Sequence, residues 1–190
     1  MIILYVASVL IFLVLSVVKG YDQTTLQFHP SGVVKQVEYA DQAVRMKGGP
    51  IISVATDDGV VIVTIPEKER SKDRHTLEIQ GSHRGKVHFL DDNEELVLTV
   101  TGLGSDASAL VDAAKRVVSE YRASCDCTIA PKALASGLAD ILHSQTRQKG
   151  SRPLAVAAAV AGYDEDTRKP QLFVIDTSGG CESRRACFLG

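Results

Sequence analysis

The chain contains no tryptophan, and only 5% of its 190 residues are aromatic. A chain so poor in aromatic rings has few surfaces on which the bases of a single-stranded nucleic acid could stack. It also lacks an excess of positive charge, because 23 Asp and Glu outnumber 21 Lys and Arg and the formal net charge is −2. Proteins that bind nucleic acids usually carry a basic patch. The composition therefore gives no support for a nucleic-acid partner.

No CxxC motif occurs among the four cysteines, which are Cys125, Cys127, Cys181 and Cys187. The closely spaced Cys125 and Cys127 have no second pair to complete a zinc-finger pattern, which argues against a metal site. An even number of cysteines would permit two disulfides in an oxidising compartment. The same number is normal for reduced thiols, and this is the interpretation that we favour. We expect neither a metal nor a cofactor.

An apolar, uncharged run, Ile2–Val18, stands at the start of the chain and is followed by Lys19 and Gly20. As a helix it would be about 25 Å long, somewhat short of the roughly 30 Å hydrocarbon core of a bilayer. It is similar to the apolar part of a signal peptide, but no Lys or Arg precedes it. Residues 1–20 are therefore interpreted as a separate leader: a signal peptide, a membrane anchor or a gene-model artefact.

The residues after the leader predict an arm, a turn and a helix. The arm is expected to be extended over Gln23–Phe28, and Pro30 and Gly32 predict a turn over His29–Gly32. Apolar residues at spacings of three and four predict a helix over Val33–Arg45, with Ser31 as its N-cap.

The rest of the chain predicts strands grouped around two helices. Strands are expected at Pro50–Thr56, Val60–Ile65, Lys86–Leu90, Leu96–Thr101, Leu154–Gly162 and Leu172–Ile175, with one more after Cys181. Helices are expected at Ser105–Arg122 and Pro131–Thr146. The continuous apolar run in the fifth of these strands is typical of a strand that is buried on both faces. Because strands and helices are grouped rather than alternating, the predicted fold class is α+β.

Several short motifs near the start of the chain resemble the N-terminal signature of proteasome α-type subunits: Tyr21-Asp22, Phe28, Pro30, Gly32, Gln36–Ala40 and Ala43-Val44. Later landmarks of that family are matched in order by Asp58–Val61, Gly102-Leu103, Asp106-Ala107, Arg152-Pro153 and Asp176–Gly179. The resemblance covers residues 21–190. It departs from the family at Gln23, where an Arg is usual. It also departs at the end, because typical family members continue beyond the position of Gly190.

The resemblance implies a four-layer αββα sandwich, the N-terminal-nucleophile hydrolase fold, apparently truncated at the C-terminus. It also implies a non-catalytic subunit of the outer ring of the proteasome core particle. Such a subunit contributes to ring assembly, gates the entry of unfolded protein and docks regulatory particles, in ubiquitin-dependent protein degradation in the cytoplasm and nucleus. The implied partners are other α subunits, β subunits, activators and unfolded substrates.

The same resemblance assigns two sites. Tyr21, Asp22, Pro30 and Tyr39 match a cluster that stabilises the gate. Lys86 matches a pocket lysine that pairs with the C-terminal carboxylate of docking activators. Simpler interpretations stay open, since Tyr39 can pack under its helix and Lys86 can be a solvated lysine at the start of a strand.

The catalytic residues of an N-terminal-nucleophile hydrolase find no match. Such an enzyme needs a Thr, Ser or Cys whose own α-amino group acts as base. The corresponding position falls at about Gly49, the acidic partner near Ile65, and the basic partner near Gly85 with Lys86 adjacent. Because the first two positions carry no suitable group, we expect no catalytic residue in this chain.

Two alternatives to a ring subunit stay open. One is an active threonine-type hydrolase, against which the missing groups argue. The other is a membrane-anchored or lumenal protein of the same fold, located in the endoplasmic reticulum or a membrane. Only the leader supports it.

Overall fold

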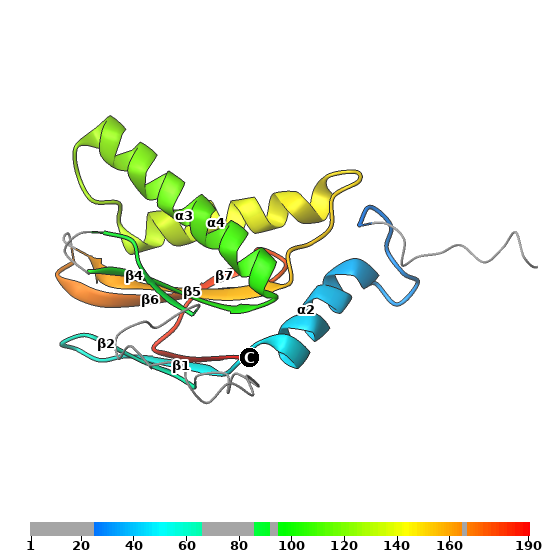
Figure 1. Cartoon of the computed structure of the whole chain (residues 1–190), viewed down its shortest axis with the longest axis horizontal. Coiled ribbons are helices and arrows are strands. Elements are labelled where there is room, and N and C mark those ends of the chain that lie inside the picture. Colours follow the sequence, from blue (N-terminus) through cyan, green and yellow to red (C-terminus); the bar gives the residue numbers. More distant parts are fainter. Residues whose placement is uncertain (1–24, 66–85, 92–94, 165–166) are drawn as a thin grey trace, which may run out of the picture.

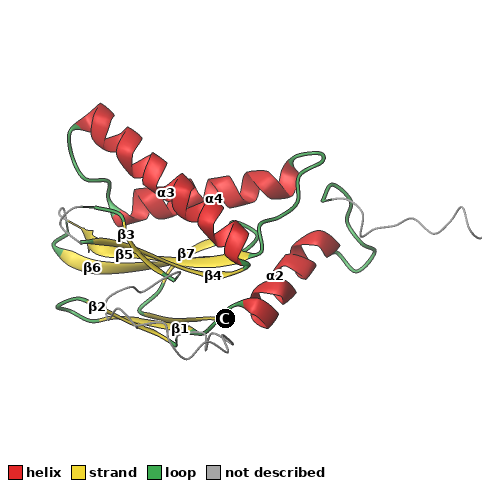
Figure 2. Cartoon of the chain, in the orientation of Figure 1, coloured by secondary structure: helices red, strands yellow, loops and turns green. Residues whose placement is uncertain are grey.

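The computed structural model describes residues 25–65, 86–91, 95–164 and 167–190. The leader and the expected gate residues Tyr21 and Asp22 lie outside these ranges. Figure 1 shows that the described residues form stacked layers, with two long helices above a larger sheet and a smaller sheet below it. A third helix, α2, lies beside the sheets (Figure 2).

The chain enters these layers in the order that the sequence predicts: one helix, strands, two helices and more strands. The helices are α2 (Lys35–Lys47), α3 (Gly104–Cys125) and α4 (Pro131–Arg147). The strands are β1 (Ile51–Ala55), β2 (Val60–Thr64), β3 (Val87–Phe89), β4 (Leu96–Gly102), β5 (Val156–Asp164), β6 (Lys169–Ile175), β7 (Cys181–Ser183) and β8 (Ala186–Leu189).

All the strand pairs in the two sheets are antiparallel. The larger sheet has five strands in the order β3-β4-β5-β6-β7, and the smaller has three in the order β2-β1-β8. The turn at Asp57–Gly59 joins β1 to β2, as predicted for a hairpin. On its other side β1 pairs with β8, so that Ile51 lies opposite Leu189. The last described strand therefore lies on the side of β1 opposite β2.

Strand β5 is buried on both faces, as its apolar run predicts. Val156, Ala158 and Val160 belong to the core under α3 and α4, together with Leu110, Leu134 and Leu138 of the helices. The alternate residues Ala159 and Ala161 face the smaller sheet, where they pack with Ile51, Leu172 and Leu189. Because side chains alternate along a strand, one strand takes part in both cores.

Helix α2 packs against the end of the larger sheet through a small apolar contact. Ala40 and Val44 are buried against Ala155, which precedes β5. The turn before the helix is as predicted, since the Gly32 N–H donates to the His29 oxygen at 2.8 Å and Gly32 has a φ of 85°. The predicted N-cap is wrong: Val34 is the N-cap, without a side-chain hydrogen bond, and the Ser31 hydroxyl lies 2.7 Å from His29 Nδ1 instead.

The outer face of the smaller sheet is apolar and exposed. Its exposed residues come from all three strands: Ile52, Val54, Val61, Val63 and Phe188. Phe188 is the most exposed of them, at 63%. In β1 these positions alternate with the buried Ile51 and Ser53, so the strand has one inward and one outward apolar face.

The fold is α+β, as predicted from the sequence, and the strands of its two sheets are antiparallel. The described residues form three layers, one helical and two of sheet, and a second helical layer is not among them. Within the described ranges, no helix combines the length and apolarity needed to cross a membrane.

Candidate functional site at the α2 end of the sandwich

The predicted lysine lies at the end of the sandwich where α2 passes into β1. Lys86 directly precedes β3 and is partly buried. Its ammonium donates a hydrogen bond to the backbone oxygen of Ile65 at 3.1 Å. A Cβ added to Gly49 would lie 1.8 Å from the same nitrogen. The structure therefore brings Lys86 together with Gly49 and Ile65, whereas Gly85, the predicted position of the basic partner, lies outside the described residues.

Close packing of the backbone fixes this end of the sandwich. The Thr101 hydroxyl donates to the Gly49 oxygen at 2.8 Å, and the Ile65 N–H donates to the Pro50 oxygen at 3.3 Å. A Cβ on Gly48 would meet the Val44 oxygen at 2.4 Å and the Thr101 hydroxyl at 2.7 Å. Only a glycine fits this contact, because a backbone oxygen cannot move aside as the end of a side chain can.

Among the described residues, the site has a cation but no group beside it that could act as a nucleophile. Gly49 has no side chain, and Ile65 contributes only its backbone oxygen to Lys86. The nearby Thr101 is 2% exposed, lies in the middle of the chain and uses its hydroxyl to hold Gly49. An ammonium that keeps N–H bonds free of the Ile65 contact can instead bind an anion, such as a carboxylate.

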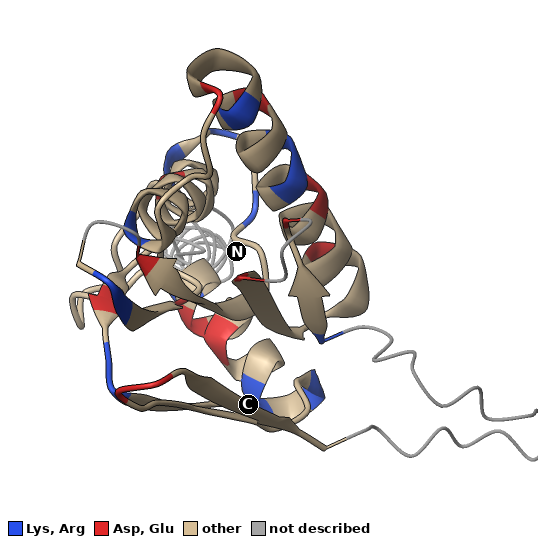
Figure 3. Ribbon diagram, turned by 90° about the vertical axis from the view of Figure 1, so that its left-hand side faces the viewer, with Lys and Arg blue, Asp and Glu red and all other residues tan. Residues whose placement is uncertain are grey.

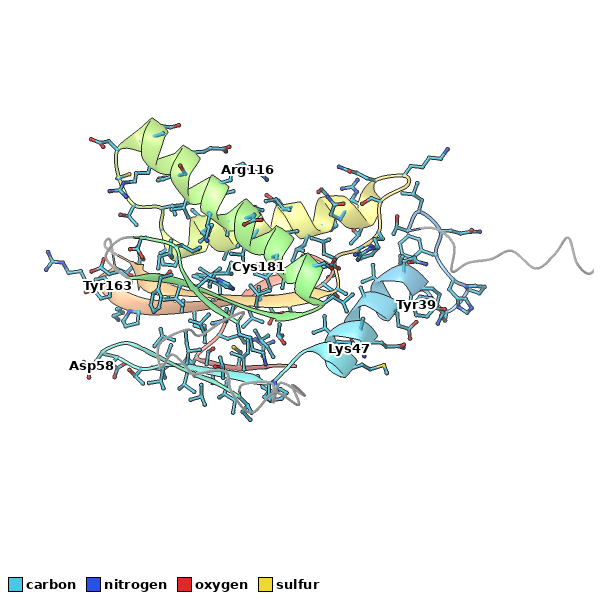
Figure 4. All side chains as sticks on the ribbon, viewed as in Figure 1. Tyr39, Lys47, Asp58, Arg116, Tyr163 and Cys181 are labelled. Carbon is cyan, nitrogen blue, oxygen red and sulfur yellow. The ribbon has the colours of Figure 1, made fainter. Side chains whose placement is uncertain are left out.

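The two described members of the expected gate cluster lie at the N-terminal side of this end. Pro30 is exposed in the turn before α2. Tyr39 is 45% exposed on the helix (Figure 4), so it is not buried beneath α2. Nearby, Lys35 donates to Glu38 at 2.7 Å, which raises the pKa of Lys35 above its ordinary value. Tyr21 and Asp22 lie outside the described residues, so their contacts with Tyr39 stay a prediction.

A buried carboxylate near the site was missed from the sequence. Asp106, in the first turn of α3, is 4% exposed and accepts two hydrogen bonds from the Arg152 guanidinium, at 2.6 and 2.7 Å. It also accepts the Ala155 N–H at 2.9 Å. The pairing with Arg152 is the main reason why the pKa of Asp106 is lowered. This pair fixes the start of α3 to the segment that packs under α2.

A second acidic side chain organises the turn after β6. Asp176 Oδ1 accepts the Ser178 N–H and the Gly180 N–H, both at 2.8 Å. Gly179 has a φ of 86°, and a Cβ there would lie 2.5 Å from the Ala139 oxygen of α4. The Asp-x-Ser-Gly motif is thus a structural turn that packs on a helix.

Charged residues of both signs are interspersed over the ribbon (Figure 3). Helix α3, for example, carries Asp106 in its first turn and Arg122 in its last. Together with the net charge of −2, this distribution gives the described surface no single dominant sign.

Comparison with known proteins identifies the family. The family model described as proteasome subunit matches residues 46–190. The proteasome subunit alpha of Saccharolobus islandicus (strain L.S.2.15 / Lassen #1) is 31% identical over 171 residues, which is 90% of this chain and 66% of the relative. The chain belongs to the proteasome subunit family. The relatives bear the name of α subunits, which supports the α-type resemblance of the N-terminal motifs.

Other archaeal relatives give the same result. The proteasome subunit alpha of Saccharolobus solfataricus is 31% identical, again over 90% of this chain and 66% of the relative. That of Sulfolobus acidocaldarius is 32% identical over 160 residues, or 84% of this chain and 62% of the relative. The chain thus spans slightly less than two thirds of the length of these proteasome α subunits.

Proposed function

We propose that the chain is a non-catalytic subunit of the α ring of a proteasome core particle. In this role it contributes to ring assembly with other α and β subunits, to gating of unfolded substrates and to docking of activators. The proposal includes the complete four-layer sandwich for the assembled subunit, action in ubiquitin-dependent degradation, and a location in the cytoplasm and nucleus.

The observation that carries this proposal is the arrangement of Lys86 beside Gly49. A hydrolase of this fold would need a nucleophilic side chain at the start of β1, next to the lysine. Gly49 supplies none, while the lysine is held in place by the Ile65 oxygen at 3.1 Å. The end of the sandwich therefore retains a positioned positive charge without the group that would make it catalytic.

A positioned ammonium suits the recognition of a chain-terminal carboxylate. Within the described structure, the Lys86 ammonium donates one hydrogen bond, to the backbone oxygen of Ile65. An ammonium has three N–H donors. A charge-assisted hydrogen bond to a carboxylate contributes about 1.5–3 kcal/mol. Activators that bind through their C-terminal residues would place such a carboxylate between neighbouring subunits.

The test is binding of an activator's C-terminal peptide to particles that contain this subunit. We expect Lys86→Ala to weaken peptide binding by about tenfold or more, in line with the loss of one charge-assisted contact. Lys47→Ala is the matched control, because Lys47 is an exposed lysine in the last turn of α2 and should leave binding unchanged. Equal binding by the Lys86→Ala and wild-type particles would refute the docking role.

Assembly itself is tested separately. The tagged chain should co-purify with proteasome α and β subunits, and Lys86→Ala should do so equally well, because Lys86 contacts only Ile65 among the described side-chain hydrogen bonds. Recovery of the chain in a membrane fraction without those subunits would instead favour the membrane-anchored alternative.

A further inference from the structure

A cavity of about 700 Å³ opens at the end of the sandwich opposite α2. It lies where the β1–β2 turn, the start of β6 and the link between β7 and β8 meet. Figure 4 shows Asp58, in the β1–β2 turn, and Tyr39, on α2, at opposite ends of the molecule. The volume falls within the range of about 300–1,000 Å³ that is usual for small-molecule sites. The cavity is therefore separate from Lys86 and large enough for a small ligand.

Two neighbouring arginines, Arg184 and Arg185, form the link between the two sheets and line the cavity. The Arg184 N–H donates to the oxygen of Leu172 in the larger sheet at 2.9 Å. The Arg185 oxygen accepts the N–H of Ala55 in the smaller sheet at 2.7 Å. Figure 3 faces this end of the molecule and shows the basic link between the sheets. Backbone contacts to both sheets therefore fix the position from which the two guanidinium groups extend.

Two lysines from other elements complete the basic lining. Lys169 is the first residue of β6, and Lys132 lies in the first turn of α4. The start of α4 is packed on the larger sheet, since a Cβ on Gly162 would lie 2.8 Å from Pro131 Cγ. The cavity thus gathers four Lys and Arg side chains from three separate segments of the chain.

The acidic side chains around the two arginines neutralise little of this charge. Asp57 is the one acidic residue among the described residues that line the cavity. Its carboxylate lies 3.7 Å from the Arg185 guanidinium, and the two side chains are 96% and 91% exposed. Glu182 accepts hydrogen bonds from Arg184, but both of these side chains are also more than half exposed. Ion pairs in contact with solvent are weak, so both guanidinium groups can exchange their partners for a ligand.

The two lysines have no such partners. Among the described residues, neither Lys132 nor Lys169 forms a side-chain hydrogen bond or an ion pair. Lys132 also stands where a helix disfavours a cation, because the N-terminus of α4 carries partial positive charge and its first turn has no acidic residue. Like charges gathered in this way repel one another and oppose folding. An anion bound between them would remove that repulsion.

The cavity also has an apolar wall. Leu172 and Phe173 are buried residues of β6, and they line the cavity together with Pro170 and Ala55. Small-molecule sites usually combine such apolar walls with a few polar groups that fix the orientation of the ligand. A ligand that satisfies both parts of the lining carries negative charge at one end and a less polar group at the other.

We propose that this cavity binds a small organic molecule with two phosphate groups. Phosphate oxygens accept charge-assisted hydrogen bonds from Lys and Arg, and one guanidinium can donate two parallel N–H bonds to one phosphate. Two phosphates carry about three to four negative charges at neutral pH, which suits four basic side chains and one acidic one. The organic part lies against Leu172 and Phe173. Binding is non-covalent, and the site does not depend on the proposed ring function.

The test is calorimetric titration of the purified full-length chain with adenosine diphosphate as the probe. Adenosine tests the organic part alone, and inorganic pyrophosphate tests the phosphates alone. We expect adenosine diphosphate to bind more tightly than either. Lys132→Gln and Lys169→Gln should each weaken its binding about tenfold or more, because each removes a charge-assisted contact. Lys115→Gln is the matched control, since Lys115 is an exposed lysine on α3 that does not line the cavity.

Three outcomes would overturn the proposal. The first is the absence of binding, or equal binding by wild type and by both Lys132→Gln and Lys169→Gln. The second is an equal loss in Lys115→Gln, which would indicate attraction to surface charge in general. The third is pyrophosphate binding as tight as that of adenosine diphosphate, which would leave the apolar wall without a role. Circular dichroism shows whether each variant is folded, and replacement of exposed lysines is expected to preserve the structure.

Discussion

The ammonium of Lys86 occupies the space that a side chain at Gly49 would need, since an added Cβ would lie 1.8 Å from the nitrogen. The two residues are far apart in sequence and meet at one end of the sandwich. While Lys86 holds its present position, this contact leaves no room for a side chain at Gly49.

Gly49→Ala should displace the Lys86 ammonium and break its hydrogen bond to Ile65. The end of a lysine moves easily, so we expect the free energy of unfolding to fall by less than about 1 kcal/mol. Activator-peptide binding should fall as it does in Lys86→Ala.

The comparison variant is Gly48→Ala, whose Cβ would meet a backbone oxygen at 2.4 Å. That variant should lose about 1–3 kcal/mol of stability in chemical denaturation. Equal stability of the two variants would contradict the assigned packing.

Tyr39→Phe should alter gating without altering folding. Because Tyr39 is 45% exposed, the loss of its hydroxyl leaves no buried group without a partner. We expect a change of less than about 0.5 kcal/mol in the free energy of unfolding. Basal hydrolysis of a small peptide by the assembled particle should change, because the phenol is proposed to hold one gate arrangement. Unchanged basal hydrolysis would leave Tyr39 without a gating role.

Asp106→Asn should make the fold less stable at neutral pH and less sensitive to acid. The pKa of Asp106 is lowered in the folded chain, chiefly by Arg152. The carboxylate's contribution is therefore complete above its ordinary pKa of 3.8, and it is lost as the pH falls below that value through the folded pKa. We expect a loss of about 1–3 kcal/mol at pH 7 by denaturation. Asp112→Asn, on the exposed side of α3, should change stability by less than about 0.5 kcal/mol.

The isolated chain should associate with itself through the outer face of the smaller sheet. Exposed apolar patches of this kind are common sites of association and aggregation. Phe188→Ser and Val61→Thr should therefore reduce the concentration-dependent light scattering of the purified chain. Met46→Ser is the control, because Met46 is 80% exposed but lies on α2, away from the sheet. A similar reduction in the control would point to general hydrophobicity rather than to this face.

Local patterns were sufficient to predict most elements of the fold. The helices at Pro131–Arg147 and Gly104–Cys125 follow from apolar spacing, and the hairpin around Asp57–Gly59 from turn chemistry. The predicted N-cap at Ser31 is wrong because the Ser31 hydroxyl contacts His29 instead, and helix α2 starts at Lys35. Such boundaries depend on competing local hydrogen bonds that a periodic pattern does not contain.

Contacts between distant residues were harder to predict. The positions of Gly49 and Lys86 followed from a family resemblance, but their contact did not. Asp106 and Arg152 form an ion pair but are well separated along the chain. The only local signal for this pair is that Asp106 is an acidic residue in the first turn of a predicted helix. The end of α3 after Cys125 depends on the left-handed backbone at Asp126, a conformation that residues other than glycine adopt infrequently.

The pairing of β1 with β8 has a consequence for folding during synthesis on the ribosome. The β1–β2 hairpin emerges early, whereas the strand that lies beside β1 is synthesised only at Ala186–Leu189. Until these residues are synthesised, one edge of β1 therefore lacks its native neighbour, and closing so long a loop is slow. The nascent chain consequently carries an open strand edge that chaperones or other nascent chains can reach first.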